Sequence, residues 1–145
     1  MKKKKSFIII GCVLLFSQIL FASVQSADEQ TSKHLATLEK PATSPSGLYE
    51  LAVTIPDKND KLMYSFQISD QSKKVIFTPE LTFSIRSTTY WLWDENDRVW
   101  VYSGDIGTYF WEKNDNGTWT KNSYRKSNVT APKFLKETRP RWHKK

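Results

Sequence analysis

The chain has few of the residues that build disulfide frameworks, thiol sites and histidine sites. Its one cysteine, Cys12, lies in an apolar run near the N-terminus, so the rest of the chain has no disulfide, thiol nucleophile or cysteine metal site. Its two histidines, His34 and His143, fall in segments that we expect to be a linker and a tail, which would not hold a catalytic group rigidly. Nucleotide-binding, serine-hydrolase and zinc-protease motifs are missing as well. We therefore predict a protein that is not an enzyme and that uses no cofactor or metal.

A helical period is also missing, whereas apolar and polar residues alternate at a spacing of two in several places. Four such segments, at residues 49–55, 62–68, 75–77 and 81–85, precede an aromatic stretch. Together they predict an all-β domain over residues 47–124. We expect an antiparallel sandwich or an up-and-down barrel of about eight short strands.

The aromatic stretch, Tyr90–Lys121, holds five of the six tryptophans. Turn signals at Asp94–Asp97, Gly104–Gly107 and Asn114–Gly117 divide it into a four-strand meander. Hairpins centred on these turns predict a cross-strand row made of Trp93, Trp100, Trp111 and Trp119. A second row on the same face contains Trp91, Tyr102 and Tyr109.

This tryptophan face is more apolar than the opposite face, which carries one apolar row, Leu92, Val101 and Phe110. We therefore expect the tryptophan face to form the core. The alternative is an exposed platform on which the rings of both rows would stack on a glycan or an apolar ligand, although large exposed apolar patches are uncommon without a partner.

Residues 1–26 have the layout of an export signal, with Lys2–Lys5 ahead of an apolar run over residues 7–24. Cleavage near Ser26 would release the domain, whereas an uncleaved run is just long enough to anchor it in a membrane. With the lysines held inside, both alternatives export the remainder of the chain. We predict a periplasmic or extracellular protein of a bacterium. Residues 27–46 are polar and predict a disordered, flexible linker.

Charge is divided unevenly along the chain. Residues 28–120 contain 9 basic and 14 acidic residues, whereas residues 121–145 contain 9 basic and 1 acidic. Residues 125–145 therefore predict a basic tail, either solvated or laid over the acidic domain. Such a tail also suits an anionic polymer or a membrane surface, without specific nucleic acid recognition. The candidate contacts with a polyanion are Arg125, Lys126, Arg139, Arg141, Lys144 and Lys145.

Carboxylates at the predicted turns leave a second class of function open. Asp94, Glu95, Asp97, Asp105, Glu112 and Asp115 lie in or beside the aromatic stretch. Two acids on either side of a bond would make a carbohydrate-active hydrolase, but Asp and Asn are expected at turns for backbone reasons. Our leading hypothesis is an exported, non-enzymatic β domain that binds a glycan or protein partner in the cell envelope. The alternatives are this hydrolase and polyanion binding by the tail.

Overall fold

The computed structural model describes residues 33–57, 59 and 61–144. The predicted export signal or anchor, the first residues of the predicted linker and Lys145 lie outside these ranges. Among the described helices, none has the length and apolar character needed to cross a bilayer.

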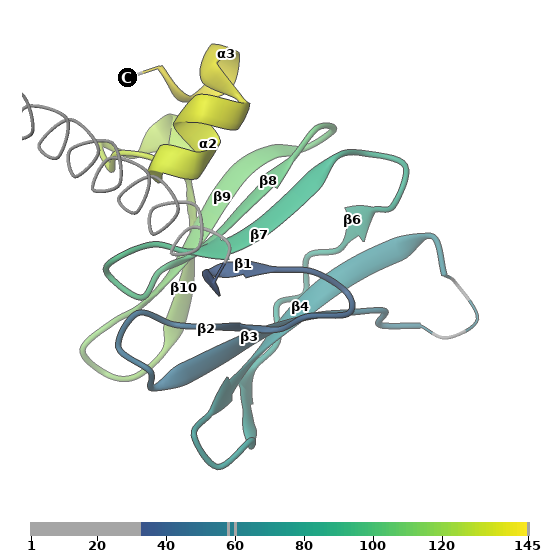
Figure 1. Ribbon diagram of the computed structural model, residues 1–145, viewed down its shortest axis with the longest axis vertical. Coiled ribbons are helices and arrows are strands. Elements are labelled where there is room, and N and C mark those ends of the chain that lie inside the picture. Colours follow the sequence, from purple (N-terminus) through teal and green to yellow (C-terminus); the bar gives the residue numbers. More distant parts are fainter. Residues whose placement is uncertain (1–32, 58, 60, 145) are drawn as a thin grey trace, which may run out of the picture. The chain divides into compact units, whose positions relative to one another are not determined.

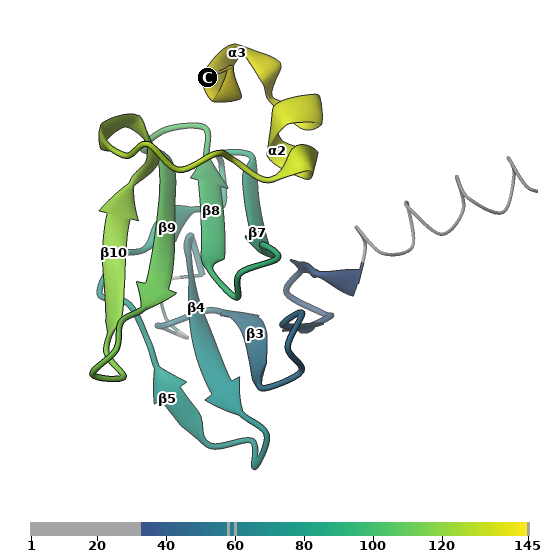
Figure 2. The same cartoon turned by 90° about the vertical axis from the view of Figure 1, so that its left-hand side faces the viewer.

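Two antiparallel sheets of five strands each face one another (Figures 1 and 2). One sheet has the order β1-β7-β8-β9-β10; the other has the order β2-β3-β4-β5, with β6 also paired to β4. The first contains β1 (Leu35–Ala36), β7 (Thr89–Trp93), β8 (Val99–Ser103), β9 (Gly107–Lys113) and β10 (Trp119–Ser123). The second contains β2 (Ala42–Thr43), β3 (Tyr49–Thr54), β4 (Met63–Asp70), β5 (Val75–Phe77) and β6 (Phe83–Ser84). The predicted all-β sandwich is confirmed, and so is the four-strand meander.

The predicted register of the meander is wrong in each of its three hairpins. In the first hairpin Trp93 pairs with Val99 instead of the predicted Trp100. The Asp94 N–H donates to the Arg98 carbonyl oxygen over 3.0 Å, which leaves three loop residues. The last of them, Asp97, has a φ of +56°, as expected for a type I turn followed by a left-handed residue. Leu92 therefore pairs with Trp100. A shift of one residue moves a side chain to the other face of the sheet.

The other two hairpins of the meander also have three residues in their loops. Ser103 pairs with Gly107, whose φ is +96°. In the third hairpin the Asn114 N–H donates to the Thr118 carbonyl oxygen over 2.9 Å. Trp119 consequently pairs with Lys113, a shift of two residues from the predicted register that keeps it on its predicted face. The predicted row therefore loses Trp100, which lies on the outer face.

The core between the sheets contains the other four tryptophans of the stretch. Trp111 meets Phe66 of β4 edge to face, with ring centroids 5.0 Å apart, and Trp91 meets Phe83 of β6 at 6.3 Å. Such aromatic pairs add about 0.5–1.5 kcal/mol each beyond the area that they bury. The predicted role of the tryptophan face as core is confirmed for these four residues. They are Trp91, Trp93, Trp111 and Trp119.

The outer face of the meander forms a second apolar cluster that the C-terminal segment covers. This segment contains η1 (Tyr124–Lys126), α2 (Lys133–Thr138) and α3 (Pro140–His143), and it crosses one end of the sheet (Figure 2). Leu135 of α2 is fully buried against the cluster. The predicted basic tail is therefore corrected to a folded layer, residues 124–144, which we call the C-terminal cap. A sheet with two apolar faces needs a layer on each, because exposed apolar area is costly.

The described part of the predicted linker also belongs to the sandwich. Ala36 of β1 and Ala42 of β2 are buried, and the indole N–H of Trp93 donates to the Ala42 carbonyl oxygen over 2.9 Å. The backbone N–H of Trp93 donates to the His34 carbonyl oxygen over 2.9 Å. The domain therefore begins ahead of the predicted boundary at Gly47, because these short strands cover the Trp93 edge of the core.

Candidate functional site

The five tryptophans of the meander do not form a binding surface. Each of them is at most 7% exposed, so none presents a ring face to a ligand. Of the two tyrosines in the predicted rows, Tyr102 is buried and Tyr109 is half-buried. The sixth tryptophan, Trp142 of α3, is 58% exposed. The exposed indole is therefore in the C-terminal cap and not in the aromatic stretch.

The indole N–H groups show that these rings serve the fold. Trp93 donates to a backbone carbonyl, as described above, and Trp100 donates to the Asp94 carboxylate over 2.8 Å. The indole N–H groups of Trp91 and Trp119 are buried and have no acceptor among the described residues. These rings contribute apolar area to the core, and they are not arranged to recognise a ligand.

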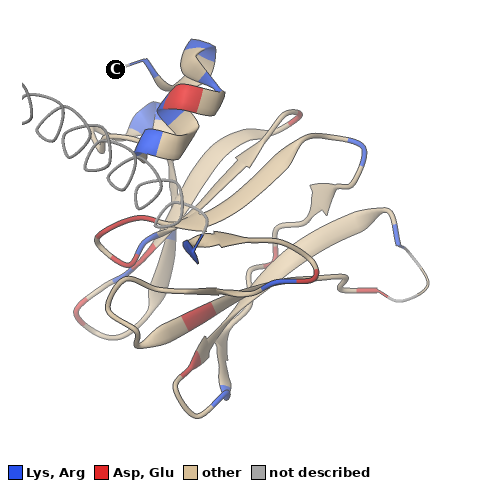
Figure 3. Cartoon of the chain, in the orientation of Figure 1, with Lys and Arg blue, Asp and Glu red and all other residues tan. Residues whose placement is uncertain are grey.

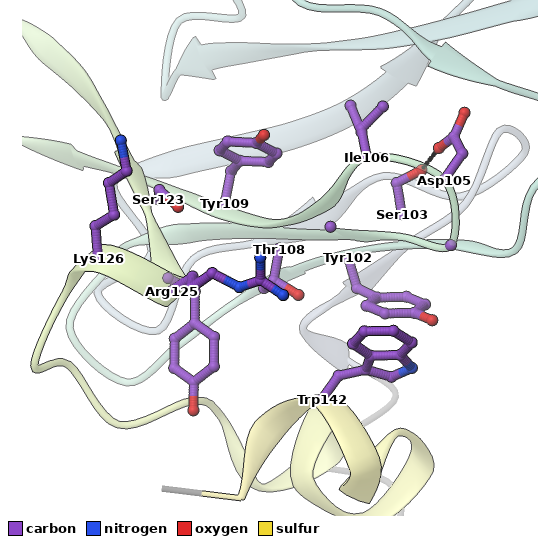
Figure 4. A pocket seen from close by; sticks show the side chains of 13 residues that line it. Tyr102, Ser103, Asp105, Ile106, Thr108, Tyr109, Ser123, Arg125, Lys126 and Trp142 are labelled. Atoms are coloured by element: carbon purple, nitrogen blue, oxygen red, sulfur yellow. Dashed lines mark hydrogen bonds between the residues drawn. The ribbon is translucent and has the colours of Figure 1, made fainter.

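A cavity of about 430 Å³ lies where the β8–β9 hairpin, η1 and α3 meet. Its volume is within the range of ligand pockets, about 300–1,000 Å³. Figure 4 shows the Trp142 ring beside the Tyr102 ring on one side of it, with Arg125 and Lys126 projecting from η1 and Asp105 near the hairpin loop. We call this the C-terminal cavity.

The element η1 holds two cations at the cavity because Tyr124 anchors it. The Tyr124 ring is buried and packs against Trp100, with centroids 5.7 Å apart, and against His143, with centroids 5.4 Å apart. Burial raises the pKa of the Tyr124 hydroxyl. The next two residues, Arg125 and Lys126, are exposed and line the cavity. Within the described part of the chain, neither cation forms an ion pair, so both are free to meet an anion.

His143 positions Trp142 by fixing the end of the chain against β9. It is 1% exposed, and its Nδ1–H donates to the Arg139 carbonyl oxygen over 3.0 Å. Its Nε2 lies 2.9 Å from the Thr108 hydroxyl. A carbonyl only accepts, so Nδ1 carries the proton and Nε2 accepts from Thr108 in the neutral ring. With His143 turned inward, the neighbouring Trp142 is left outward.

Burial also lowers the pKa of His143, and we therefore expect the protein to lose stability in mild acid. A histidine whose pKa is lower in the folded state binds fewer protons there than in the unfolded state, so its contribution is present above the unfolded pKa of about 6.5 and lost as pH falls below it. Urea unfolding between pH 7.5 and 5 measures this loss. His143→Gln should flatten the dependence, and an unchanged slope in that variant would contradict the assignment. The lowered pKa values of Asp70 and Asp105 act only at more acidic pH.

The described cations among those predicted for polyanion binding divide into three groups. Arg125 and Lys126 line the C-terminal cavity, whereas Arg141 and Lys144 are exposed on the C-terminal cap away from its lining. Arg139 lies over the Tyr90 and Tyr102 rings, 5.4 and 5.5 Å from their centroids, and its Nη2 donates to the Tyr90 hydroxyl. It serves the fold. Lys145 is outside the described residues. Basic positions thus gather on the C-terminal cap (Figure 3).

The carboxylates of the predicted turns lie in different surroundings. Asp94 is buried and paired with Arg98. Asp97 and Glu112 line one shallow hollow, but Asp97 accepts from the Ser46 N–H and Glu112 from the Asn122 amide. Glu95 and Asp115 are exposed in the loops. Among the described residues, no group of three or more His, Cys, Asp or Glu could hold a metal.

Among the described residues, Asp105 is the one acidic residue in the lining of the C-terminal cavity. The Ser103 hydroxyl donates to its carboxylate, and this lowers the Asp105 pKa. A general acid in glycoside hydrolysis needs a raised pKa. Asp105 is therefore suited to accept hydrogen bonds and not to donate a proton.

Sequence reasoning missed Trp142 and His143 as site residues because it treated residues 125–145 as a tail, and it missed Tyr124 at the end of the predicted β domain. A usable signal was present: the apolar outer row needs cover, and Phe134 and Leu135 interrupt the basic segment. No protein family model matches this chain, and no curated protein or solved structure matches it significantly. A function must therefore be inferred from the fold and from the C-terminal cavity.

Proposed function

We propose that the protein is an exported, non-enzymatic binding module of the bacterial cell envelope, and that its ligand is an anionic polymer held in the C-terminal cavity. The lysines and the apolar run at the N-terminus support export. One observation carries the binding site: an exposed indole, Trp142, and two cations without an ion pair among the described residues, Arg125 and Lys126, line one cavity of about 430 Å³. The other five tryptophans are buried within the fold.

The position of these cations favours a local site over adhesion by the whole cap. Arg125 and Lys126 both line a hollow, and the guanidinium of Arg125 extends towards the side of the hollow that carries Trp142 (Figure 4). Arg141 and Lys144 do not line this cavity. A hydrogen bond to a charged group contributes about 1.5–3 kcal/mol, whereas an isolated exposed charge contributes less and is screened by salt.

A charge-matched comparison tests the site. The pair Arg125→Gln and Lys126→Gln removes two cations from the cavity, and the pair Arg86→Gln and Lys136→Gln removes two exposed cations elsewhere. With heparin as a general polyanion, we expect the first pair to weaken binding about tenfold or more and the second about twofold or less, as measured by calorimetry at 0.15 M salt. The heparin should remain uncleaved.

Equal losses in the two pairs would assign binding to overall charge, which removes the cavity from the proposal. Absence of binding by the unaltered protein to both heparin and anionic vesicles would reject the proposal altogether. Binding to the vesicles alone would move the ligand from a polymer to a lipid surface.

A further inference from the structure

We infer that the ligand of the C-terminal cavity is an acidic saccharide: a sugar ring that carries an anionic group, within a polysaccharide. This inference rests on the proposed function and adds the chemical class of the ligand. The inference comes from three kinds of chemical group that line the same cavity. These are an apolar ring face, a pair of cations and a hydroxyl-rich edge with a single carboxylate.

The apolar ring face belongs to Trp142. All six tryptophans are among the described residues, and Trp142 is 58% exposed whereas the others are at most 7% exposed. A large aromatic ring gains most when it is buried, so an indole left open at a cavity is available for a flat apolar surface. The C–H face of a sugar ring is such a surface. Inorganic polyphosphate has none, and its contact with the indole would gain little.

The cations are on a different element from the ring. Arg125 and Lys126 project from η1, while Trp142 is on α3. The Arg125 guanidinium extends towards the Trp142 side of the cavity (Figure 4), so an anionic group on the edge of a ring stacked on Trp142 would meet Arg125 first. The planar guanidinium of Arg125 matches a carboxylate with two parallel hydrogen bonds.

The carboxylate of Asp105 discriminates between a polyanion of uniform charge and a saccharide. It is exposed at the rim of the cavity and accepts from the Ser103 hydroxyl. An ionised carboxylate repels phosphate groups, so it opposes a ligand that is charged along its whole length. The same group accepts hydrogen bonds from sugar hydroxyls, which sugars present at several ring positions. Ser123 and Thr108 add hydroxyls to the same lining.

Three probes of similar length test this assignment: oligogalacturonate, inorganic polyphosphate and neutral maltohexaose. We expect oligogalacturonate to bind about tenfold more tightly than polyphosphate, and maltohexaose to bind too weakly to measure. Trp142→Ala should weaken oligogalacturonate about tenfold and polyphosphate about twofold or less. Acrylamide quenching of the exposed indole should fall when oligogalacturonate is bound.

Asp105→Asn gives the sharpest readout, because the two ligand classes predict opposite signs. For a saccharide the variant loses a strong hydroxyl acceptor, so oligogalacturonate binding weakens while polyphosphate binding strengthens. If both probes bind Asp105→Asn more tightly, Asp105 acts only as a repelling charge and the saccharide assignment is overturned. A preference for polyphosphate that Arg125→Gln abolishes would overturn it as well but leave the proposed function standing. If none of the probes, heparin or vesicles binds, both proposals fail.

Discussion

Removal of residues 128–145 should abolish the folded domain, although this segment reads as a solvated basic tail. The deletion uncovers the outer cluster of the meander, which contains Leu92, Trp100, Tyr102 and Phe110. Exposing one large apolar side chain of this kind to water lowers the stability of the fold by about 1.5–3 kcal/mol. Because a domain of this size has a net stability of only about 5–15 kcal/mol, we expect an aggregated or unfolded product. Gel filtration and the intrinsic tryptophan spectrum would report it.

A point variant separates this effect from the loss of charge. Leu135 is fully buried under the C-terminal cap, so Leu135→Ala should lower the free energy of unfolding by about 2–5 kcal/mol. Trp142→Ala, in the same cap but at an exposed ring, should change it by about 0.5 kcal/mol or less. Urea titration measures both. Full stability of the shortened chain and of Leu135→Ala would restore the interpretation of the segment as a free tail.

Asp94→Ala is expected to be the most damaging substitution at a polar residue. One carboxylate oxygen accepts from the backbone N–H groups of Asn96 and Arg98 over 2.9 and 3.0 Å. The other accepts from Arg98 Nε over 2.7 Å and from the Trp100 indole over 2.8 Å. Removing this carboxylate leaves a partly buried cation and a buried N–H without their acceptor. Breaking such a buried pair costs about 3–5 kcal/mol.

A matched residue in another loop provides the control. Asp70 begins the β4–β5 loop as Asp94 begins the β7–β8 loop, and it accepts from the backbone N–H groups of Ser72 and Lys74 over 2.9 and 3.1 Å. It binds no indole and no arginine. Asp70→Ala should therefore cost only about 1 kcal/mol. Thermal and urea unfolding of both variants measure the difference, and equal costs would show that Asp94 acts only as a turn residue.

The pattern of side chains along the chain is enough to place most strands. Alternation at a spacing of two placed β3 and β4, and the clusters of Asp, Asn and Gly placed the three turns of the meander. The abundance of tryptophan indicated an aromatic core. These features are local, since a strand with one buried face must alternate and a tight turn needs residues that tolerate its backbone angles.

The face on which Trp100 lies depends on a finer feature. It follows from whether Trp93 pairs with Trp100, as predicted, or with Val99, as observed, and the residues D-E-N-D suit both. The one-residue difference in pairing places Trp100 away from the core, where its indole N–H donates to Asp94. Local propensity could not decide this, because the choice depends on how well each face is covered by the rest of the fold.

By itself, the sequence determined an all-β, disulfide-free domain with an aromatic meander at its centre. It could do so because alternation, turn residues and composition depend only on residues that are close together in the chain. Only the tertiary structure decided that all five tryptophans of the meander are buried, and that the basic segment is a layer and not a tail. The reason is long-range packing: the outer face of the meander must be covered, and the C-terminal cap is the element that covers it. The same packing turned His143 inward and Trp142 outward, and so created the cavity proposed as the binding site.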